Sequence, residues 1–200
     1  MSIEKQKLLL HSCCAPCSVK CIASLAEEGI KPALFWYNPN IHPFTEYRER
    51  RDTLVRFAAD AGLELISDDE YGLRLFLRGL YGIAEESPAD DRPQALHQPR
   101  CAYCYRLRLE KTAARAAEEG YDYFSTTLLI SPYQNHDLIR QIGEDLGQNY
   151  GVKFLYRDFR PLFRAGQARA RELGLYMQKY CGCIFSEEER YLAKKERALS

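Results

Sequence analysis

Residues 8–21 have the sequence LLLHSCCAPCSVKC, which combines a short apolar run, four cysteines and the start of a helical pattern. The apolar run predicts a buried strand that ends at His11. Apolar residues then recur at helical spacing over residues 19–26. Pro16 suits the first position of this helix, so Cys17 would lie in the first turn, where the macrodipole favours a thiolate. We therefore expect a strand–loop–helix unit with cysteines in its loop.

The alternation of strand and helix continues along the chain. Apolar runs end at turn-forming residues, and amphipathic stretches lie between them. The expected strands cover residues 32–37, 63–66, 121–129 and 152–156, and the expected helices cover residues 45–62, 73–80, 101–120, 136–147 and 164–174. Residues 87–100 are typical of a mobile loop, and residues 83–99 are the only linker-like stretch. The pattern predicts one α/β domain over residues 1–200, in which helices sandwich a parallel sheet and ligands bind at the carboxyl ends of the strands.

Composition limits the partners and the compartment. The 28 Lys and Arg residues balance the 28 Asp and Glu residues, so the net charge favours no particular partner. A nucleic acid would need a local basic patch, although arginines on helices are commonly just solvated. The candidates are Arg100, Arg106, Arg108, Arg157, Arg160, Arg164, Arg169 and Arg171. Since we find neither a signal peptide nor a stretch that could cross a membrane, we expect a soluble cytoplasmic protein whose cysteines stay reduced and bind metal.

Seven of the eight cysteines form three groups that are far apart in the chain, which suggests one site assembled in space. The groups are Cys13, Cys14 and Cys17, then Cys101 and Cys104, then Cys181 and Cys183. Adjacent Cys13 and Cys14 side chains point different ways in most backbone conformations, so we expect this pair to serve two neighbouring metals. Cys21 lies on the apolar side of the first helix and is expected to be a core thiol.

Seven sulfurs are more than one metal site needs. A cubane iron–sulfur cluster uses about four thiolates, which leaves three for a mononuclear site with an open position. We therefore hypothesise a cluster beside a second metal. Two simpler interpretations remain open. One is a structural zinc held by four thiolates, and the other is thiol–disulfide exchange, which needs only two cysteines.

Polar residues at the ends of three expected strands are candidates for the rest of the site. His11 borders the cysteine loop and could donate a proton, although a histidine that ends a strand is more often structural. The NPNIHP and SPYQN loops offer amides for base edges and a ring for stacking, or they simply turn the chain out of the sheet. Their candidate substrate-binding residues are Asn38, Asn40, His42, Tyr133, Gln134 and Asn135.

Together these motifs resemble the cobalamin-independent epoxyqueuosine reductases, which act in tRNA queuosine synthesis. The resemblance covers nearly the whole chain and rests on HSCCAPCS, WYNPNIHP, RCAYCYRLRLEKTA, FSTTLLISPYQN and YCGC, in that order. It implies a Rossmann-like α/β sandwich of the adenine nucleotide alpha-hydrolase type. It also implies an oxidoreductase that converts epoxyqueuosine at the tRNA wobble position to queuosine.

The resemblance further implies a 4Fe-4S cluster and a neighbouring metal, iron or, as isolated, zinc. Some family members have aspartate at the position of Cys17, and because a carboxylate can also hold iron, this variation puts Cys17 at the mononuclear site. An open-sided metal can act as the Lewis acid for the epoxide oxygen, and the cluster would pass electrons from an external electron donor. His11, Cys13 and Cys17 are then the expected catalytic residues. The expected division of ligands is Cys14, Cys101, Cys104 and Cys183 for the cluster, and Cys13, Cys17 and Cys181 for the mononuclear metal.

Two other functions remain as alternatives. An ATP-dependent tRNA-modifying sulfur transferase on the same fold would need a Ser-Gly-Gly-rich phosphate loop after the first strand, where this chain has HSCCAPCS. A zinc-stabilised RNA-binding module would be colourless, whereas an iron–sulfur protein absorbs visible light.

Overall fold

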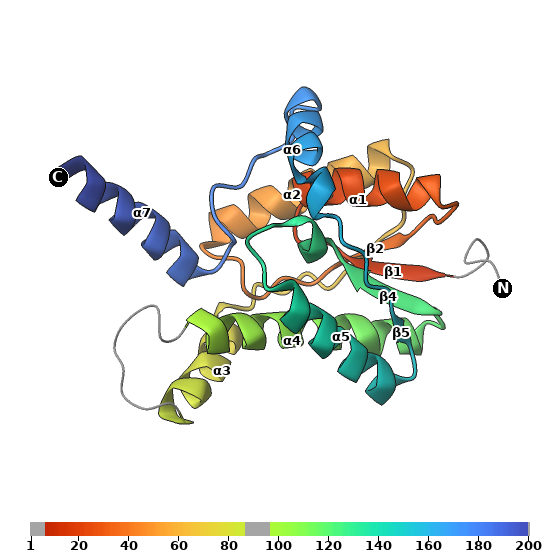
Figure 1. Cartoon of the computed structure of the whole chain (residues 1–200), viewed down its shortest axis with the longest axis horizontal. Helices are drawn as coiled ribbons and strands as arrows, with labels where there is room; N and C mark the ends of the chain where they lie inside the picture. Colours follow the sequence, from red (N-terminus) through yellow and green to blue (C-terminus); the bar gives the residue numbers. More distant parts are fainter. Residues whose placement is uncertain (1–6, 87–96, 200) are drawn as a thin grey trace.

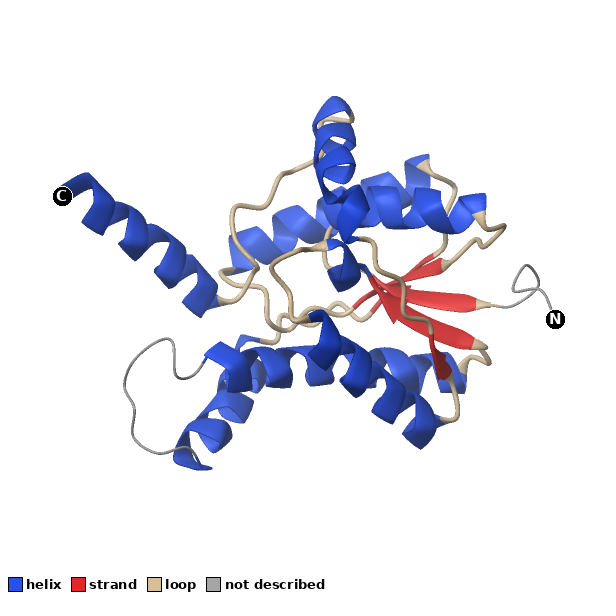
Figure 2. Cartoon of the chain, viewed as in Figure 1, coloured by secondary structure: helices blue, strands red, loops and turns tan. Residues whose placement is uncertain are grey.

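The chain folds around a five-stranded parallel sheet that lies between two layers of helices, as seen in a computed structural model that describes residues 7–86 and 97–199 (Figures 1 and 2). The strands are β1 (Leu8–His11), β2 (Ala33–Trp36), β3 (Leu65–Ser67), β4 (Tyr123–Thr126) and β5 (Lys153–Phe154). Their order is β3-β2-β1-β4-β5, and every neighbouring pair is parallel. This topology confirms the predicted α/β class with a parallel sheet between layers of helices.

Helices cover both faces of the sheet (Figure 1). One layer contains α1 (Ala15–Glu27), α2 (Phe44–Asp60) and α6 (Phe163–Glu172), and the other contains α3 (Leu73–Glu86), α4 (His97–Glu118) and α5 (His136–Tyr150). The short 3-10 helices η2 (Thr127–Ile130) and η3 (Arg160–Leu162) come after β4 and β5, and α7 (Ile184–Leu199) projects away from the sandwich. In the ranges that the structure describes, no helix is both long and apolar enough to span a membrane.

The core is centred on β1, which has strands on both sides and helices on both faces. Its residues Leu8, Leu9 and Leu10 are at most 2% exposed, so the strand is an unbroken apolar run rather than an alternating one. Trp36 at the end of β2 is fully buried, and its indole Nε1 donates to the hydroxyl of Tyr47 at 3.0 Å. Cys21 is also fully buried, as expected of a core thiol.

Several boundaries differ from the sequence expectations. The strand expected over residues 121–129 ends at Thr126, because the Thr126 hydroxyl accepts a hydrogen bond from the Leu128 amide and caps a 3-10 turn. In the stretch expected to be a linker or loop, residues 83–86 belong to α3 and residues 97–100 belong to α4, whereas residues 87–96 lie outside the described residues. Helix α7 was not expected, although its Glu, Lys, Arg and Ala residues are strong helix formers.

The loops that carry the candidate site residues meet at one edge of the sheet. The cysteine loop follows β1, the NPNIHP loop follows β2, and η2 with the SPYQN loop follows β4, so all three leave the carboxyl ends of parallel strands. Helix α4 leads into β4 and therefore begins at this same edge, with Cys101 and Cys104 in its first two turns. The segment before α7 joins them, because the His42 amide donates to the carbonyl oxygen of Gly182 at 2.8 Å.

Close packing of α5 against the chain at β5 gives a test of the fold. A Cβ added at Gly147 would lie 2.7 Å from the carbonyl oxygen of Val152, so Gly147→Ala should lower the free energy of unfolding by about 1–3 kcal/mol. Gly82 on α3 is exposed and would place its Cβ in open space, so Gly82→Ala should leave stability unchanged or raise it by about 1 kcal/mol. Urea unfolding compares the two variants, and equal stabilities would contradict the packing described.

Candidate metal centre

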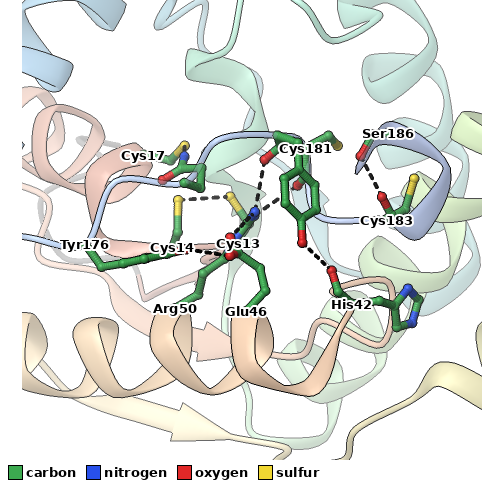
Figure 3. A network of polar contacts seen from close by, with 12 residues as sticks. Cys13, Cys14, Cys17, His42, Glu46, Arg50, Tyr176, Cys181, Cys183 and Ser186 are labelled. Carbon is green, nitrogen blue, oxygen red and sulfur yellow. Dashed lines mark hydrogen bonds and ion pairs between the residues drawn. The ribbon is translucent and has the colours of Figure 1, made fainter. Parts of the chain in front are cut away.

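Three cysteine sulfurs converge where β1 passes into α1. The Sγ atoms of Cys13 and Cys14 are 3.8 Å apart, and those of Cys13, Cys14 and Cys17 all lie within 4.8 Å of one another, close enough to hold one metal ion. The expectation that Cys13 and Cys14 point different ways is therefore wrong. The chain turns from strand to helix at Cys14, the extended N-cap residue of α1, and this turn brings both sulfurs to one side (Figure 3). Cys17 lies in the first helical turn, as predicted.

The three cysteine thiols lie close enough to shift one another's pKa values. Hydrogen bonds from Cys14 and Cys17 hold the pKa of Cys13 well below its usual value. Burial raises the pKa of Cys14, and the hydrogen bond to Cys13 raises that of Cys17. A metal that binds all three sulfurs must displace the protons of the thiols.

The second and third cysteine groups lie together beside this trio. Cys104 and Cys183 are buried in one apolar cluster with Phe76. Electrostatic interactions with Cys101, Cys181 and Cys183 act on Cys104, and burial raises the pKa of the Cys104 thiol to about 12. The structure thus brings all seven grouped cysteines to the carboxyl edge of the sheet.

A buried ion pair fixes the segment that carries Cys181 and Cys183. Arg50 on α2 is 1% exposed and pairs with Glu46, one turn earlier, at 2.7 Å. Its two Nη atoms donate to the carbonyl oxygens of Cys181 at 3.0 Å and Tyr180 at 2.9 Å (Figure 3). The Tyr180 hydroxyl donates in turn to the His42 carbonyl oxygen. Helix α2 and the NPNIHP loop therefore position these cysteines.

The NPNIHP loop supports the site from within the protein. Asn38, Asn40 and His42 are at most 1% exposed and do not line the cavity described below. The Asn38 side chain donates to the Ser12 carbonyl oxygen at 3.0 Å, and burial lowers the pKa of His42 to about 4. The loop is held against the Cys181–Cys183 segment, and the expected contact of these three residues with substrate stays a prediction.

A cavity of about 480 Å³ opens beside the sulfur trio. Its lining includes Cys13, Cys17 and Cys181, and the side chains of Tyr133 and Gln134 from the SPYQN loop. Tyr133 is 81% exposed, whereas Gln134 Oε1 accepts a hydrogen bond from the Tyr105 hydroxyl at 2.8 Å. A volume of this size suits a small ligand such as a nucleoside.

Two other expected site residues make hydrogen bonds within the protein. Asn135 caps α5, because its Oδ1 accepts from the Leu138 amide at 3.1 Å. His11 is fully buried, with Nε2 3.2 Å from the Tyr37 carbonyl oxygen and Nδ1 2.9 Å from the Thr126 hydroxyl. Burial lowers the pKa of His11 to about 4, so the ring is neutral. It joins β1 to β4 and β2 rather than facing the cavity.

The expected basic patch is also divided. Arg100 and Arg108, which flank the CxxC sequence, are 5% and 1% exposed and lie against cysteines, so they cannot form a phosphate-binding surface. Three of the other expected members form ion pairs at the surface, namely Arg157 with Glu28, Arg160 with Asp158 and Arg169 with Glu172.

The chemistry of the donor set fits a thiolate-bound metal group. Cys17 Sγ accepts a hydrogen bond from Gln178 Nε2 at 3.4 Å, and Cys104 Sγ accepts one from Arg108 Nη2 at 3.1 Å, as thiolate ligands commonly do. Within the described residues, the buried Asn40 amide has no hydrogen-bond partner for either polar atom, and neither does Gln178 Oε1. Gln178 contacts Cys17 Sγ and Asn40 lies beside Gly182, so these atoms are available to hydrogen-bond a group bound there.

Sequence reasoning missed Arg50, Glu46 and Gln178. Glu46 and Arg50 share the buried face of α2 with Leu54 and Ala58, and charged residues at such core-facing positions are a detectable signal. Gln178 gave no signal, because it belongs to an irregular segment whose contact with Cys17 depends on tertiary structure.

Comparison with known proteins agrees with this site. The family model described as epoxyqueuosine reductase QueH matches residues 8–189. Curated relatives of that name include one from Dehalococcoides mccartyi, which is 38% identical over 185 residues, covering 92% of this chain and 94% of the relative. Another, from Thermotoga maritima, is 35% identical over 185 residues, with 92% and 91% coverage. A third, from Staphylococcus epidermidis, is 35% identical over 193 residues, with 92% and 77% coverage.

The fold is also similar to that of a solved structure. A crystal structure described as a predicted subunit of a tRNA methyltransferase, from Methanocaldococcus jannaschii, superposes with a TM-score of 0.50. The two chains are 14% identical, and the match covers 96% of this chain and 88% of the other. At this identity the likeness concerns the fold alone.

The buried ion pair predicts a large effect of Arg50→Gln. The substitution leaves the Glu46 carboxylate buried and two carbonyl oxygens without their donor, so the free energy of unfolding should fall by about 3–5 kcal/mol. Arg48→Gln, on the exposed side of α2, should change it by less than about 0.5 kcal/mol. Urea unfolding measures both, and a loss in Arg50→Gln no larger than in the control would show that the pair does not hold the segment.

Proposed function

This chain belongs to the epoxyqueuosine reductase QueH family, and we propose that it reduces the epoxide of epoxyqueuosine in tRNA to the alkene of queuosine. It is therefore an oxidoreductase of queuosine biosynthesis. The reaction consumes two electrons and two protons and releases the epoxide oxygen as water. The observation that carries the proposal is a cavity of about 480 Å³ whose floor contains cysteine sulfurs and whose rim carries an exposed tyrosine.

The proposed metal groups are a 4Fe-4S cluster and a mononuclear metal, iron or, as isolated, zinc. One feature of the cavity supports the division of ligands: Cys13, Cys17 and Cys181, assigned to the mononuclear metal, line it. The residues assigned to the cluster, which are not among its lining residues, are Cys14, Cys101, Cys104 and Cys183. When bound, the cluster supplies one-electron transfer from an external electron donor, and the open-sided metal supplies Lewis acidity at the oxygen.

The protein's own residues bind and orient the substrate. Tyr133 offers its exposed ring for stacking on a base. Because Gln134 Oε1 already accepts from the Tyr105 hydroxyl, its Nε2 is the atom left to donate to the substrate. Gln178 orients Cys17 by donating to its sulfur. The tRNA substrate and the reduced thiols both suit an enzyme of the cytoplasm.

Direct assay of the reaction tests this function. The protein is reconstituted anaerobically with iron and sulfide and mixed with tRNA that carries epoxyqueuosine and a chemical reductant. We expect mass spectrometry of the tRNA to show loss of one oxygen. Cys13→Ser should abolish the loss, whereas Cys21→Ala, which alters a core thiol outside the ligand groups, should retain it. An unchanged tRNA mass in the wild-type reaction would contradict the proposal, and a colourless zinc protein would favour an RNA-binding module.

Two cations beside the cavity predict how tRNA binds. Lys179 and Arg190 line the cavity and are exposed, so we expect each to contact a phosphate that flanks the modified nucleotide. Lys179→Gln and Arg190→Gln should each weaken tRNA binding and flatten the plot of log affinity against log salt by about 0.7–1. Arg140, which pairs with Glu144 away from the cavity, provides the control substitution Arg140→Gln. Filter binding at several salt concentrations measures the slopes, and identical slopes for all variants would argue against this surface.

A further inference from the structure

Arg108 places a buried positive charge directly against the cysteines. It lies on α4, one turn after Cys104, and is 1% exposed. Its Nε donates to the carbonyl oxygen of Cys104 at 3.1 Å, and its Nη2 donates to Cys104 Sγ at 3.1 Å. The guanidinium is therefore fixed at two points on the residue that it contacts.

In the described part of the chain, Arg108 has no carboxylate partner of the kind that the other buried arginines have. Arg50 pairs with Glu46 at 2.7 Å, and Arg100 pairs with Glu189 at 2.8 Å. Among the residues that the structure describes, no carboxylate forms an ion pair with Arg108. Instead, its Nη2 contacts Cys104 Sγ at 3.1 Å. Because a buried positive charge needs a compensating negative charge, we expect the group held by Cys104 to be anionic.

We propose that Arg108 is a positioning residue that raises the reduction potential of the metal cluster assigned to Cys104 and its three partner cysteines. The inference rests on the iron–sulfur site of the proposed function. When one electron enters from the external donor, no bond or proton moves, and the cluster gains one unit of negative charge. A fixed positive charge and an N–H bond to a ligand sulfur both stabilise that added charge, and both are known determinants of cluster potential.

Replacement of Arg108 while the cysteines are kept tests this role. Arg108→Gln removes the positive charge, and Arg108→Lys keeps a charge but replaces the planar fork that contacts Cys104 with a single ammonium nitrogen. Arg106 lies two residues away on the same helix and is exposed, so Arg106→Gln is the matched control. Each protein is reconstituted anaerobically, its iron and sulfide are quantified, and its midpoint potential is measured by redox titration followed by electron paramagnetic resonance.

The expected order of potentials is wild type equal to Arg106→Gln, then Arg108→Lys, then Arg108→Gln as the most negative. At the midpoint potential of the wild type, well under half of the clusters in the Arg108→Gln sample should be reduced. If Arg108→Gln binds no iron, the midpoint potential of Arg108→Lys provides the test. A wild-type potential in an iron-loaded Arg108 variant would overturn the inference and leave the reductase function intact, whereas a wild-type protein that binds no iron would overturn the proposed metal site itself.

Discussion

In a parallel sheet, every strand presents its carboxyl end to the same edge, and this constraint assembles the site. The loops after β1, β2 and β4 meet there because their strands pair in register, from His11 beside Phe35 on one side to His11 beside Thr126 on the other. Helix α4 must begin at that edge to return the chain to the start of β4, and it brings Cys101 and Cys104 with it. Topology alone therefore places five of the seven grouped cysteines together.

The last two cysteines, Cys181 and Cys183, do not lie beside the end of a strand in the sequence. Other contacts therefore hold them at the site. The segment of Cys181 and Cys183 is fixed by Arg50 through two backbone carbonyl oxygens, and Glu46 compensates the charge of Arg50 within the protein. Arg108 lacks such a carboxylate among the described residues and faces the sulfurs instead. Arg50 thus positions the segment of Cys181 and Cys183, whereas Arg108 places a positive charge beside the sulfurs.

The sequence was informative where local patterns determine the structure. The apolar run before His11, Pro16 early in α1 and the CxxC of α4 predicted the fold class and where cysteines would begin each helix, because strand, turn and helix-start signals are local. The convergence of Cys13 and Cys14 depends on one extended residue at the helix N-cap, which residue types do not specify. The roles of Arg50 and Arg108 depend on burial, and in sequence both resemble ordinary helical surface arginines.

We propose that sulfurs from three distant segments hold two distinct metal groups at one edge of the sheet. Mössbauer spectroscopy of protein reconstituted with isotopically enriched iron tests it most directly, with Cys17→Ser and Cys104→Ser compared with the wild type. We expect a four-iron component and a separate mononuclear component in the wild type. Cys17→Ser should alter only the mononuclear component, and Cys104→Ser should alter only the four-iron component. A single iron component, or one that neither substitution changes, would contradict it.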